Sequence, residues 1–373
     1  MSGPANPRLA QVWAPYMEWA KRHPRPRFDL CGSNLAPCTI DDLPGARDIV
    51  APNGDNDHGY IPLVEAIAGF YGTTSERVAL ASGASGANFL VLATLLAPGD
   101  EVLVEKPAYD PLLGAARLLG AAVKRFERSF DSGFRVDPDA VAAALTPATR
   151  LVVITHPHNP SGAALDDETL DALGDLAERH GVHVLVDEVY LDTLVPPPAP
   201  AANRSERLIS TSSLTKSYGL AGLRAGWVLA APEVADAVRR VRGTVEAIGA
   251  FPGEQLAWVA FQNIEALAAR AQAILVPGAM LMSDFVAQRR ELDWVPPSGG
   301  TVAFPRLRGH DDAGPFVERL LAEFDTSVVP GRFFEAPAHF RIAFGGDHAA
   351  LTGGLEQLGR ALDTLQGTLT TAS

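Results

Sequence analysis

The segment LVVITHPHNPSG, residues 151–162, is the clearest indication of the fold class. Its first five residues are apolar or β-branched throughout, which is typical of a strand that is buried on both faces of a sheet. The residues after them are rich in Pro, Asn, Ser and Gly, which favour a turn. Because such a strand needs helices on both sides of its sheet, the segment predicts an α/β protein.

Six further strands are predicted around this one, and helical segments such as Ala87–Leu96 and Asp167–His180 separate several of them. Strands that alternate with helices at this spacing predict a mostly parallel, seven-stranded sheet sandwiched by helices. In addition to Leu151–Thr155, the predicted strands are Arg77–Ala81, Glu101–Glu105, Ala122–Phe126, Val182–Asp187, Arg207–Thr211 and Gly226–Ala230.

The chain has 373 residues, more than one hydrophobic core usually organises, so two domains are expected. A long helical stretch covers Pro232–Val276, and a second α/β pattern follows with strands near Thr301–Pro305 and Phe340–Phe344. We predict an N-terminal segment, residues 1–50, that packs with the small domain. A large domain would comprise residues 51–270, and a smaller α/β C-terminal domain residues 271–373.

Composition and charge narrow the class of partner and the compartment. The formal net charge of −13 disfavours nucleic acid and anionic membranes as partners. The two cysteines, Cys31 and Cys38, provide neither a disulfide framework nor zinc-ligand spacing. Because Met1–Arg27 lacks the apolar core of a signal peptide and no run approaches about 18 apolar residues, a cytoplasmic enzyme is expected.

Polar side chains follow five of the predicted strands, where ligands of open α/β sheets bind. They supply a glycine turn of a size suited to phosphate, an aromatic ring, an amide, a carboxylate and a lysine. This set fits an aromatic, phosphorylated aldehyde, pyridoxal phosphate (PLP). The residues are Ser82-Gly83-Ala84-Ser85-Gly86, Tyr109, Asn159, Asp187 with Tyr190, and Ser213 with Lys216.

Each of these groups has a predicted role. Lys216 would hold the aldehyde as a Schiff base and later move protons at the substrate α-carbon. Asp187 would keep the pyridine nitrogen protonated, because a buried carboxylate favours a cationic ring. Tyr109 would stack on the ring, whereas Asn159 and Tyr190 would donate to its phenolate oxygen.

The phosphate is expected at the start of the helix that follows the first strand. The backbone N–H groups of Ala84 and Ser85, after the turn at Gly83, would bind it at a helix N-terminus. Ser213 and Arg224 would supply further donors, the arginine through its planar fork.

The run SLTKSYGLAGLRAGW, residues 213–227, resembles the PLP-lysine signature of the class I/II (fold type I) aminotransferases. The resemblance implies that Lys216, Ser213 and Arg224 all serve the cofactor. It extends from about Pro62 to about Phe344. Its other landmarks occur in the same order along the chain: Gly83-Ala84-Ser85, Tyr109, Asn159-Pro160-Ser161-Gly162, Asp187 and Tyr190.

The predicted substrate site also follows from this resemblance. The run FRIAF, residues 340–344, is similar to the segment whose arginine binds the substrate α-carboxylate, which here is Arg341. Strand alternation would direct Arg341 to the face opposite Phe340 and Ile342. The predicted substrate-binding residues also include Asn159 and Gly32. Gly32 lies in the N-terminal segment that covers the substrate in this family.

The resemblance implies exchange of an amino group between an L-amino acid and a 2-oxo acid by a homodimer. The runs PSGGTVAFP, residues 297–305, and VPGRFF, residues 329–334, are also similar to a capreomycidine-synthase-like branch, which cyclises a hydroxylated arginine. A PLP-dependent cyclase, lyase or other enzyme of β/γ-chemistry therefore remains the alternative, and the amino acid is not specified.

The family usually has a tyrosine that reaches the partner subunit's phosphate, where this chain has Asn53. A contribution of the partner to the phosphate site is therefore left open.

Other readings of these motifs are disfavoured. Ser213 and Lys216 match the Ser-x-x-Lys pattern of penicillin-interacting acylases, but the Ser-Asp-Asn and Lys-Thr-Gly elements of that class are absent. A PLP-sensing transcription regulator would need a DNA-binding domain, and no basic helix-turn-helix pattern precedes the fold. His156 and His158 have no third ligand at suitable spacing, so no metal site is predicted.

Overall fold

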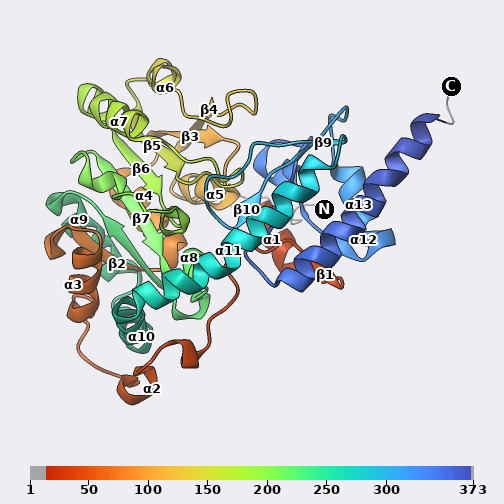
Figure 1. Ribbon diagram of the computed structural model, residues 1–373. Helices are drawn as coiled ribbons and strands as arrows, with labels where there is room; N and C mark the ends of the chain where they lie inside the picture. Colours follow the sequence, from red (N-terminus) through yellow and green to blue (C-terminus); the bar gives the residue numbers. More distant parts are fainter. Residues whose placement is uncertain (1–13, 371–373) are drawn as a thin grey trace, which may run out of the picture.

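The computed structural model describes residues 14–370, and its larger part is built on a seven-stranded sheet (Figure 1). The strand order is β2-β8-β7-β6-β5-β3-β4, with β8 antiparallel to both neighbours and every other pair parallel. The predicted mostly parallel, seven-stranded sheet is thus confirmed. Its strands are β2 (Val78–Ser82), β3 (Glu101–Lys106), β4 (Ala122–Glu127), β5 (Thr149–Thr155), β6 (His183–Asp187), β7 (Leu208–Ser213) and β8 (Ala225–Leu229).

Helices cover both faces of this sheet, as the apolar segment 151–155 requires. Val153 packs into one hydrophobic cluster with α4 (Gly83–Leu95), α5 (Asp110–Leu118) and α9 (Pro232–Val245). Val152 packs into another cluster on the opposite face with α6 (Pro138–Ala144) and α7 (Asp167–His180). A third cluster joins the sheet to α2 (Ala46–Ile49), α3 (Ile61–Phe70) and α10 (Phe251–Gln262).

The smaller α/β part contains short strands and three long helices. Strands β10 (Val302–Ala303), β14 (Phe340–Ala343) and β13 (Val329–Pro330) form an antiparallel sheet in that order. The N-terminal β1 (Phe28–Asp29) pairs with β12 (Thr326–Ser327), which attaches the N-terminal segment to this part. The remaining elements are β9 (Leu292–Asp293), β11 (Arg306–Leu307), α1 (Pro15–Arg22), α11 (Ile264–Ala287), α12 (Gly314–Phe324) and α13 (His348–Thr370).

Helix α11 runs through residue 270, where the domain boundary is predicted, and contributes to both parts. Its Leu267 belongs to a cluster of the large part, whereas Leu275 and Met282 belong to the core of the small part. Among the described helices it alone has the length and apolar composition of a membrane span. It packs against α10 and α13 as a connecting helix. The domain limits at residues 50 and 270 stay predictions, and residues 1–13 of the first segment lie outside the described residues.

Several element boundaries differ from the sequence expectation by a few residues, and two of these differences have clear local reasons. Helix α4 starts at Gly83 rather than Ala87, because Gly83 has a φ of +73° and turns the chain directly from strand into helix. Strand β7 continues to Ser213 because Ser212 and Ser213 pair with β8. Six short 3-10 helices and α8 (Leu214–Ser217) complete the fold: η1 (Ile40–Asp42), η2 (Ser75–Arg77), η3 (Leu191–Thr193), η4 (Ala201–Asn203), η5 (Ala221–Leu223) and η6 (Gly331–Phe334).

Candidate active site

A cavity of about 530 Å³ lies where the predicted site residues converge. Such a volume suits a cofactor-sized ligand. Two predicted residues are not part of its wall: Gly83 lies against Arg224, and Arg341 is fully buried. The predicted residues that do line it are Gly32, Ala84, Ser85, Tyr109, Asn159, Asp187, Tyr190, Ser213, Lys216 and Arg224.

Lys216 lies on the short helix α8, directly after strand β7. The Ser213 hydroxyl caps this helix by accepting a bond from the Thr215 N–H at 3.3 Å. Lys216 Nζ donates to Ser33 Oγ and to Asn34 Oδ1, each at 2.7 Å. Burial, with a smaller effect from the positive charge of Arg341, lowers the pKa of Lys216 to about 7. At neutral pH a substantial fraction of this amine is therefore unprotonated and nucleophilic.

Asp187 ends strand β6 and is held by two donors. Asn88 Nδ2 donates to Oδ2 at 2.7 Å, and the Val189 N–H donates to Oδ1 at 3.2 Å. Asn88 is itself fixed by a 2.5 Å bond from the Thr211 hydroxyl. Burial raises the pKa of Asp187, and the Asn88 bond opposes that rise. Sequence reasoning missed Asn88, although a lone amide within the apolar helix α4 was a signal.

Arg341 on strand β14 is a buried cation whose recorded partners are all neutral. Its Nη1 donates to Asn159 Oδ1 at 3.1 Å, and its Nη2 donates to the Tyr16 hydroxyl at 2.5 Å and to the Cys31 carbonyl at 3.3 Å. Its Nε has no partner, and no ion pair is recorded for it among the described side chains. Since a buried guanidinium is stable only when its charge is compensated, this arrangement favours an anionic ligand.

Tyr16 on α1 is a second residue that sequence reasoning missed. It stands edge-on to Tyr109, with ring centroids 6.0 Å apart, and lines the cavity. The Tyr109 hydroxyl donates to Met17 Sδ at 3.4 Å. Because the hydroxyl is engaged there, the group that Tyr109 presents to the cavity is its aromatic ring. The Tyr190 hydroxyl donates to the Ser33 carbonyl at 3.2 Å, so in this structure it is engaged with the N-terminal segment.

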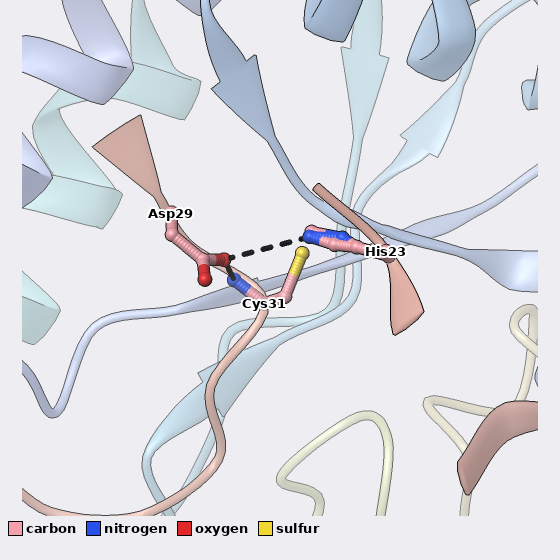
Figure 2. Close-up of side chains that lie close together, drawn as sticks. All are labelled: His23, Asp29 and Cys31. Carbon is pink, nitrogen blue, oxygen red and sulfur yellow. Dashed lines mark hydrogen bonds and ion pairs between the residues drawn. The ribbon is translucent and has the colours of Figure 1, made fainter. Parts of the chain in front are cut away.

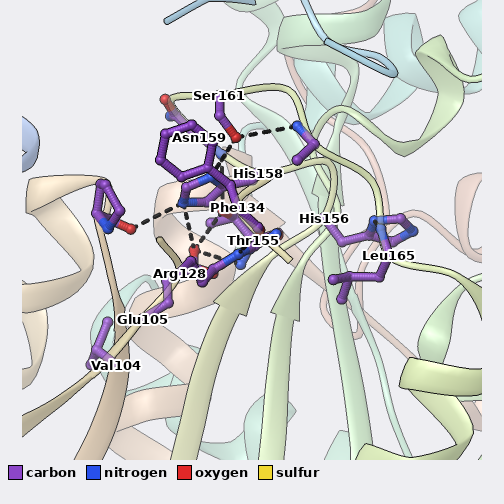
Figure 3. A network of polar contacts seen from close by, with 12 residues as sticks. Val104, Glu105, Arg128, Phe134, Thr155, His156, His158, Asn159, Ser161 and Leu165 are labelled. Carbon is purple, nitrogen blue, oxygen red and sulfur yellow. Dashed lines mark hydrogen bonds and ion pairs between the residues drawn. The ribbon is translucent and has the colours of Figure 1, made fainter. Parts of the chain in front are cut away.

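The loop that carries Asn159 is supported by a buried polar network (Figure 3). Arg128 and Glu105 form an ion pair at 2.6 Å with both side chains fully buried. Glu105 Oε1 also accepts from the Thr155 hydroxyl at 2.6 Å, and Thr155 Oγ1 accepts from the Asn159 N–H at 3.0 Å. His158 bridges Ser161 Oγ and the Pro107 carbonyl. His156 and His158 therefore serve this loop and do not line the cavity.

The expected phosphate position lies at the N-terminus of the 13-residue helix α4. Ala84 and Ser85 are in its first turn, where backbone N–H groups lack partners within the helix. Arg224 stands beside this turn, because its Nη2 donates to the Ser82 carbonyl at 3.0 Å. A Cβ at Gly83 would come within 2.4 Å of the same Nη2, so glycine is needed for the arginine to approach.

A second group of polar side chains lies close together (Figure 2), and all three of its members line the same cavity. His23, Asp29 and Cys31 have potential ligand atoms that all lie within 4.8 Å of one another. They come from the N-terminal segment, in which sequence reasoning predicted only Gly32.

The site residues fit pyridoxal phosphate by their chemistry. A partly unprotonated lysine suits its aldehyde, a buried carboxylate its pyridine nitrogen, and a helix N-terminus with an arginine its phosphate. Fold and site together define the class of an enzyme that works through a lysine and this cofactor.

Comparison with known proteins specifies the family. The sequence model of the family "Aminotransferase class I and II" matches residues 54–358. Capreomycidine synthase of Streptomyces vinaceus is 34% identical, over 76% of this chain and 73% of that protein. A PLP-dependent aminotransferase from Streptococcus suis superposes with a TM-score of 0.89, at 25% identity, over 95% of this chain and 98% of that one. The PLP-dependent cyclase OrfR superposes with a TM-score of 0.84, at 28% identity, over 98% and 99%.

This chain belongs to the class I and II aminotransferases. It is accordingly an enzyme that depends on pyridoxal phosphate and exchanges amino groups, with amino acids and 2-oxo acids as the substrates of its family.

Proposed function

We propose that this aminotransferase takes the amino group of an L-amino acid through Lys216 and passes it to a 2-oxo acid. The observation that carries the proposal is Arg341, a buried cation with neutral partners only, beside the cavity that contains Lys216. An α-carboxylate is the planar anion that would complete its fork of donors. A substrate without a carboxylate would leave that charge uncompensated.

The other residues have roles that follow from their contacts. When bound, pyridoxal phosphate supplies the electron sink that makes the α-proton of an amino acid acidic. Asp187, buried and held by Asn88, would keep the ring nitrogen protonated. Lys216 Nζ would take the α-proton and return a proton to complete the exchange. Asn159 Oδ1 is engaged by Arg341, which leaves its amide N–H groups to donate to the cofactor.

A cytoplasmic homodimer is part of the proposal. Support comes from exposed apolar side chains on the large part: Ile61 and Phe70 on α3, with Val245 at the end of α9 and Ile248 just after it. Exposed apolar groups of this kind are typical of a surface that another subunit covers, and a twofold dimer is the commonest oligomer. Asn53 is exposed, and we assign it no contact with the cofactor.

A spectroscopic screen of L-amino acids against the holoenzyme tests this function. Substrates should change the cofactor's absorbance in a single turnover, and a 2-oxo acid should restore it. Sedimentation velocity on the same protein should give a dimer. If no amino acid changed the absorbance although PLP were bound at Lys216, the proposed transamination would be wrong.

A second candidate is cyclisation of an amino-acid substrate on the same site. It is favoured by the 28% identity to the cyclase OrfR over nearly the whole chain, and by the 34% identity to capreomycidine synthase. In that case the amino acid would be consumed without any 2-oxo acid, and the cofactor's absorbance would return by itself. Mass analysis of the product separates the two, because cyclisation retains the substrate's α-amino nitrogen.

A further inference from the structure

The N-terminal segment 29–34 connects three parts of the cavity. At one end, Ser33 and Asn34 accept bonds from Lys216. In the middle, the Cys31 carbonyl accepts a bond from Arg341. At the other end, Asp29 lines the cavity. Ser33 is four residues after Asp29, so the chain between them spans at most about 14 Å. A substrate held by Arg341 beside Lys216 would therefore extend its side chain along this segment toward Asp29.

Asp29 presents a carboxylate in a fixed position. Its Oδ1 accepts from the Cys31 N–H at 3.1 Å and from Ser327 Oγ at 3.0 Å. Its backbone is also fixed, because Asp29 and Ser327 are partners in the β1–β12 ladder. Both bonds end on Oδ1, and no donor to Oδ2 is recorded within the described residues. The side chain is 34% exposed, so it is reachable from the cavity.

His23 adds a buried polar ring with unused hydrogen-bonding capacity. Its side chain is only 5% exposed, yet neither Nδ1 nor Nε2 has a partner. Trp19 fixes the ring at 4.5 Å between centroids, and Nε2 lies 4.0 Å from Asp29 Oδ1. Burial lowers the pKa of His23, so the ring is neutral at neutral pH and one nitrogen accepts. A buried polar group without a partner is costly, and a ligand with donors would remove that cost.

We propose that Asp29 and His23 form a subsite for a guanidinium group at the end of the substrate's side chain. The inference rests on the proposed function and specifies its substrate class as amino acids with a guanidinium side chain. A guanidinium is planar and has five N–H donors, so it can bind a carboxylate and still donate to a neighbouring imidazole. The fixed Oδ2 and the unpartnered ring of His23 are the two acceptors that this geometry needs.

Two other ligands fit this site less well. A transition metal would take the Cys31 thiolate, but burial raises the pKa of that thiol and its hydrogen is directed to Ser327 Oγ at 3.3 Å. An acidic side chain would be drawn to Arg25, which also lines the cavity. Arg25 is exposed, however, and would have to be ordered on binding, whereas Asp29 is already held in place.

The test compares L-arginine with L-citrulline, which replaces the guanidinium by a neutral urea of nearly the same shape. We expect the wild-type holoenzyme to favour L-arginine at least tenfold, both in kcat/KM and in affinity measured by calorimetry. Asp29→Asn should reduce this preference to about one, because the amide oxygen keeps both bonds to Oδ1 but loses the charge. His23→Phe should reduce it severalfold while preserving the packing on Trp19. Asp41→Asn, at an exposed ion pair with Arg47, is the matched control and should leave the preference unchanged.

The outcomes separate this inference from the proposed function. If wild type handled L-arginine and L-citrulline equally, the subsite would be wrong although transamination would stand. If no amino acid were turned over but calorimetry still showed an Asp29-dependent preference for L-arginine, the subsite would stand and transamination would be wrong. A preference for L-glutamate that Arg25→Ala removes would overturn the inference in favour of an acidic substrate. Tight Zn²⁺ binding lost in His23→Phe, with an unchanged L-arginine preference, would make the cluster a metal site.

Discussion

Asn88 Nδ2 donates to Asp187 Oδ2 at 2.7 Å, linking the middle of helix α4 to the end of strand β6. The Thr211 hydroxyl, from the neighbouring strand β7, orients the Asn88 amide by donating to its oxygen. The carboxylate that we assign to the pyridine nitrogen is therefore positioned by a residue on a helix that also begins at the expected phosphate site. One helix would thus position both ends of the cofactor.

Asn88→Ala should lower kcat/KM about tenfold or more, because a hydrogen bond to a charged group contributes about 1.5–3 kcal/mol. The pKa of Asp187 should rise further, since the Asn88 bond lowers it. Steady-state kinetics across pH would measure both effects. Asn203→Ala, which removes a bond to the Tyr71 carbonyl outside the cavity, is the control. Wild-type kinetics in Asn88→Ala would mean that Asp187 does not depend on this contact.

Lys216 should carry the cofactor. Borohydride reduction of the holoenzyme followed by peptide mapping should find the adduct on Lys216, and Lys216→Ala should lose turnover while retaining weak PLP binding through the phosphate contacts. Lys106→Ala, which removes a surface pair with Glu127, should behave like wild type. An adduct on any other lysine would contradict the assignment of the Schiff base to Lys216.

The rate at which apoenzyme captures PLP should depend on pH through Lys216. Its pKa is lowered to about 7, so the unprotonated, nucleophilic amine increases as pH rises through about 7 and is nearly complete above about 8. Stopped-flow absorbance at a series of pH values would record this inflection. Arg341→Met should move it to higher pH, because the positive charge of Arg341 contributes to the lowered pKa. An inflection near 10 in wild type would show an unperturbed lysine.

Arg341→Lys keeps the positive charge but loses the planar guanidinium, whose paired N–H groups can bind a carboxylate in a bidentate manner. We expect kcat/KM for the amino-acid substrate to fall by about 2 kcal/mol, roughly 30-fold, with the cofactor content unchanged. Tyr16→Phe removes only the hydroxyl that accepts from Nη2 and should cause a smaller loss. Quantitative PLP release measures the content independently of activity. Equal kcat/KM in wild type and Arg341→Lys would make Arg341 a structural residue.

Arg128→Met should be strongly destabilising, because it leaves the fully buried Glu105 without its ion-pair partner. Removing one partner of a buried pair costs about 3–5 kcal/mol. Arg47→Met breaks an exposed pair with Asp41 and should cost no more than about 1 kcal/mol. Urea unfolding of the two variants compares them directly. Similar midpoints would show that the network under the Asn159 loop does not depend on this pair.

Much of the fold followed from local sequence patterns. The seven strands were predicted within a few residues, because buried strands have continuous apolar runs and end at polar or turn residues. The residues at the strand ends were also found, since parallel strands bring their carboxyl ends to one edge of the sheet. The lysine motif could be recognised because Ser213, Lys216 and Arg224 lie within one short run of the sequence. Strand β8, which follows this motif, was predicted as a strand, but its antiparallel direction and its place between β2 and β7 were not, because pairing direction leaves no periodic trace in the sequence.

The sequence by itself therefore determined the α/β class, the family and the residues at the sheet edge, all of which depend on short-range patterns. Folding alone brought Tyr16 to Arg341, 325 residues away along the chain, and Ser33 to Lys216, 183 residues away. It also assembled His23, Asp29 and Cys31 into a wall of the same cavity. These contacts arise because the N-terminal segment pairs with β12 and closes over the sheet edge. Such long-range packing depends on the whole fold, so no local run of residues predicts it.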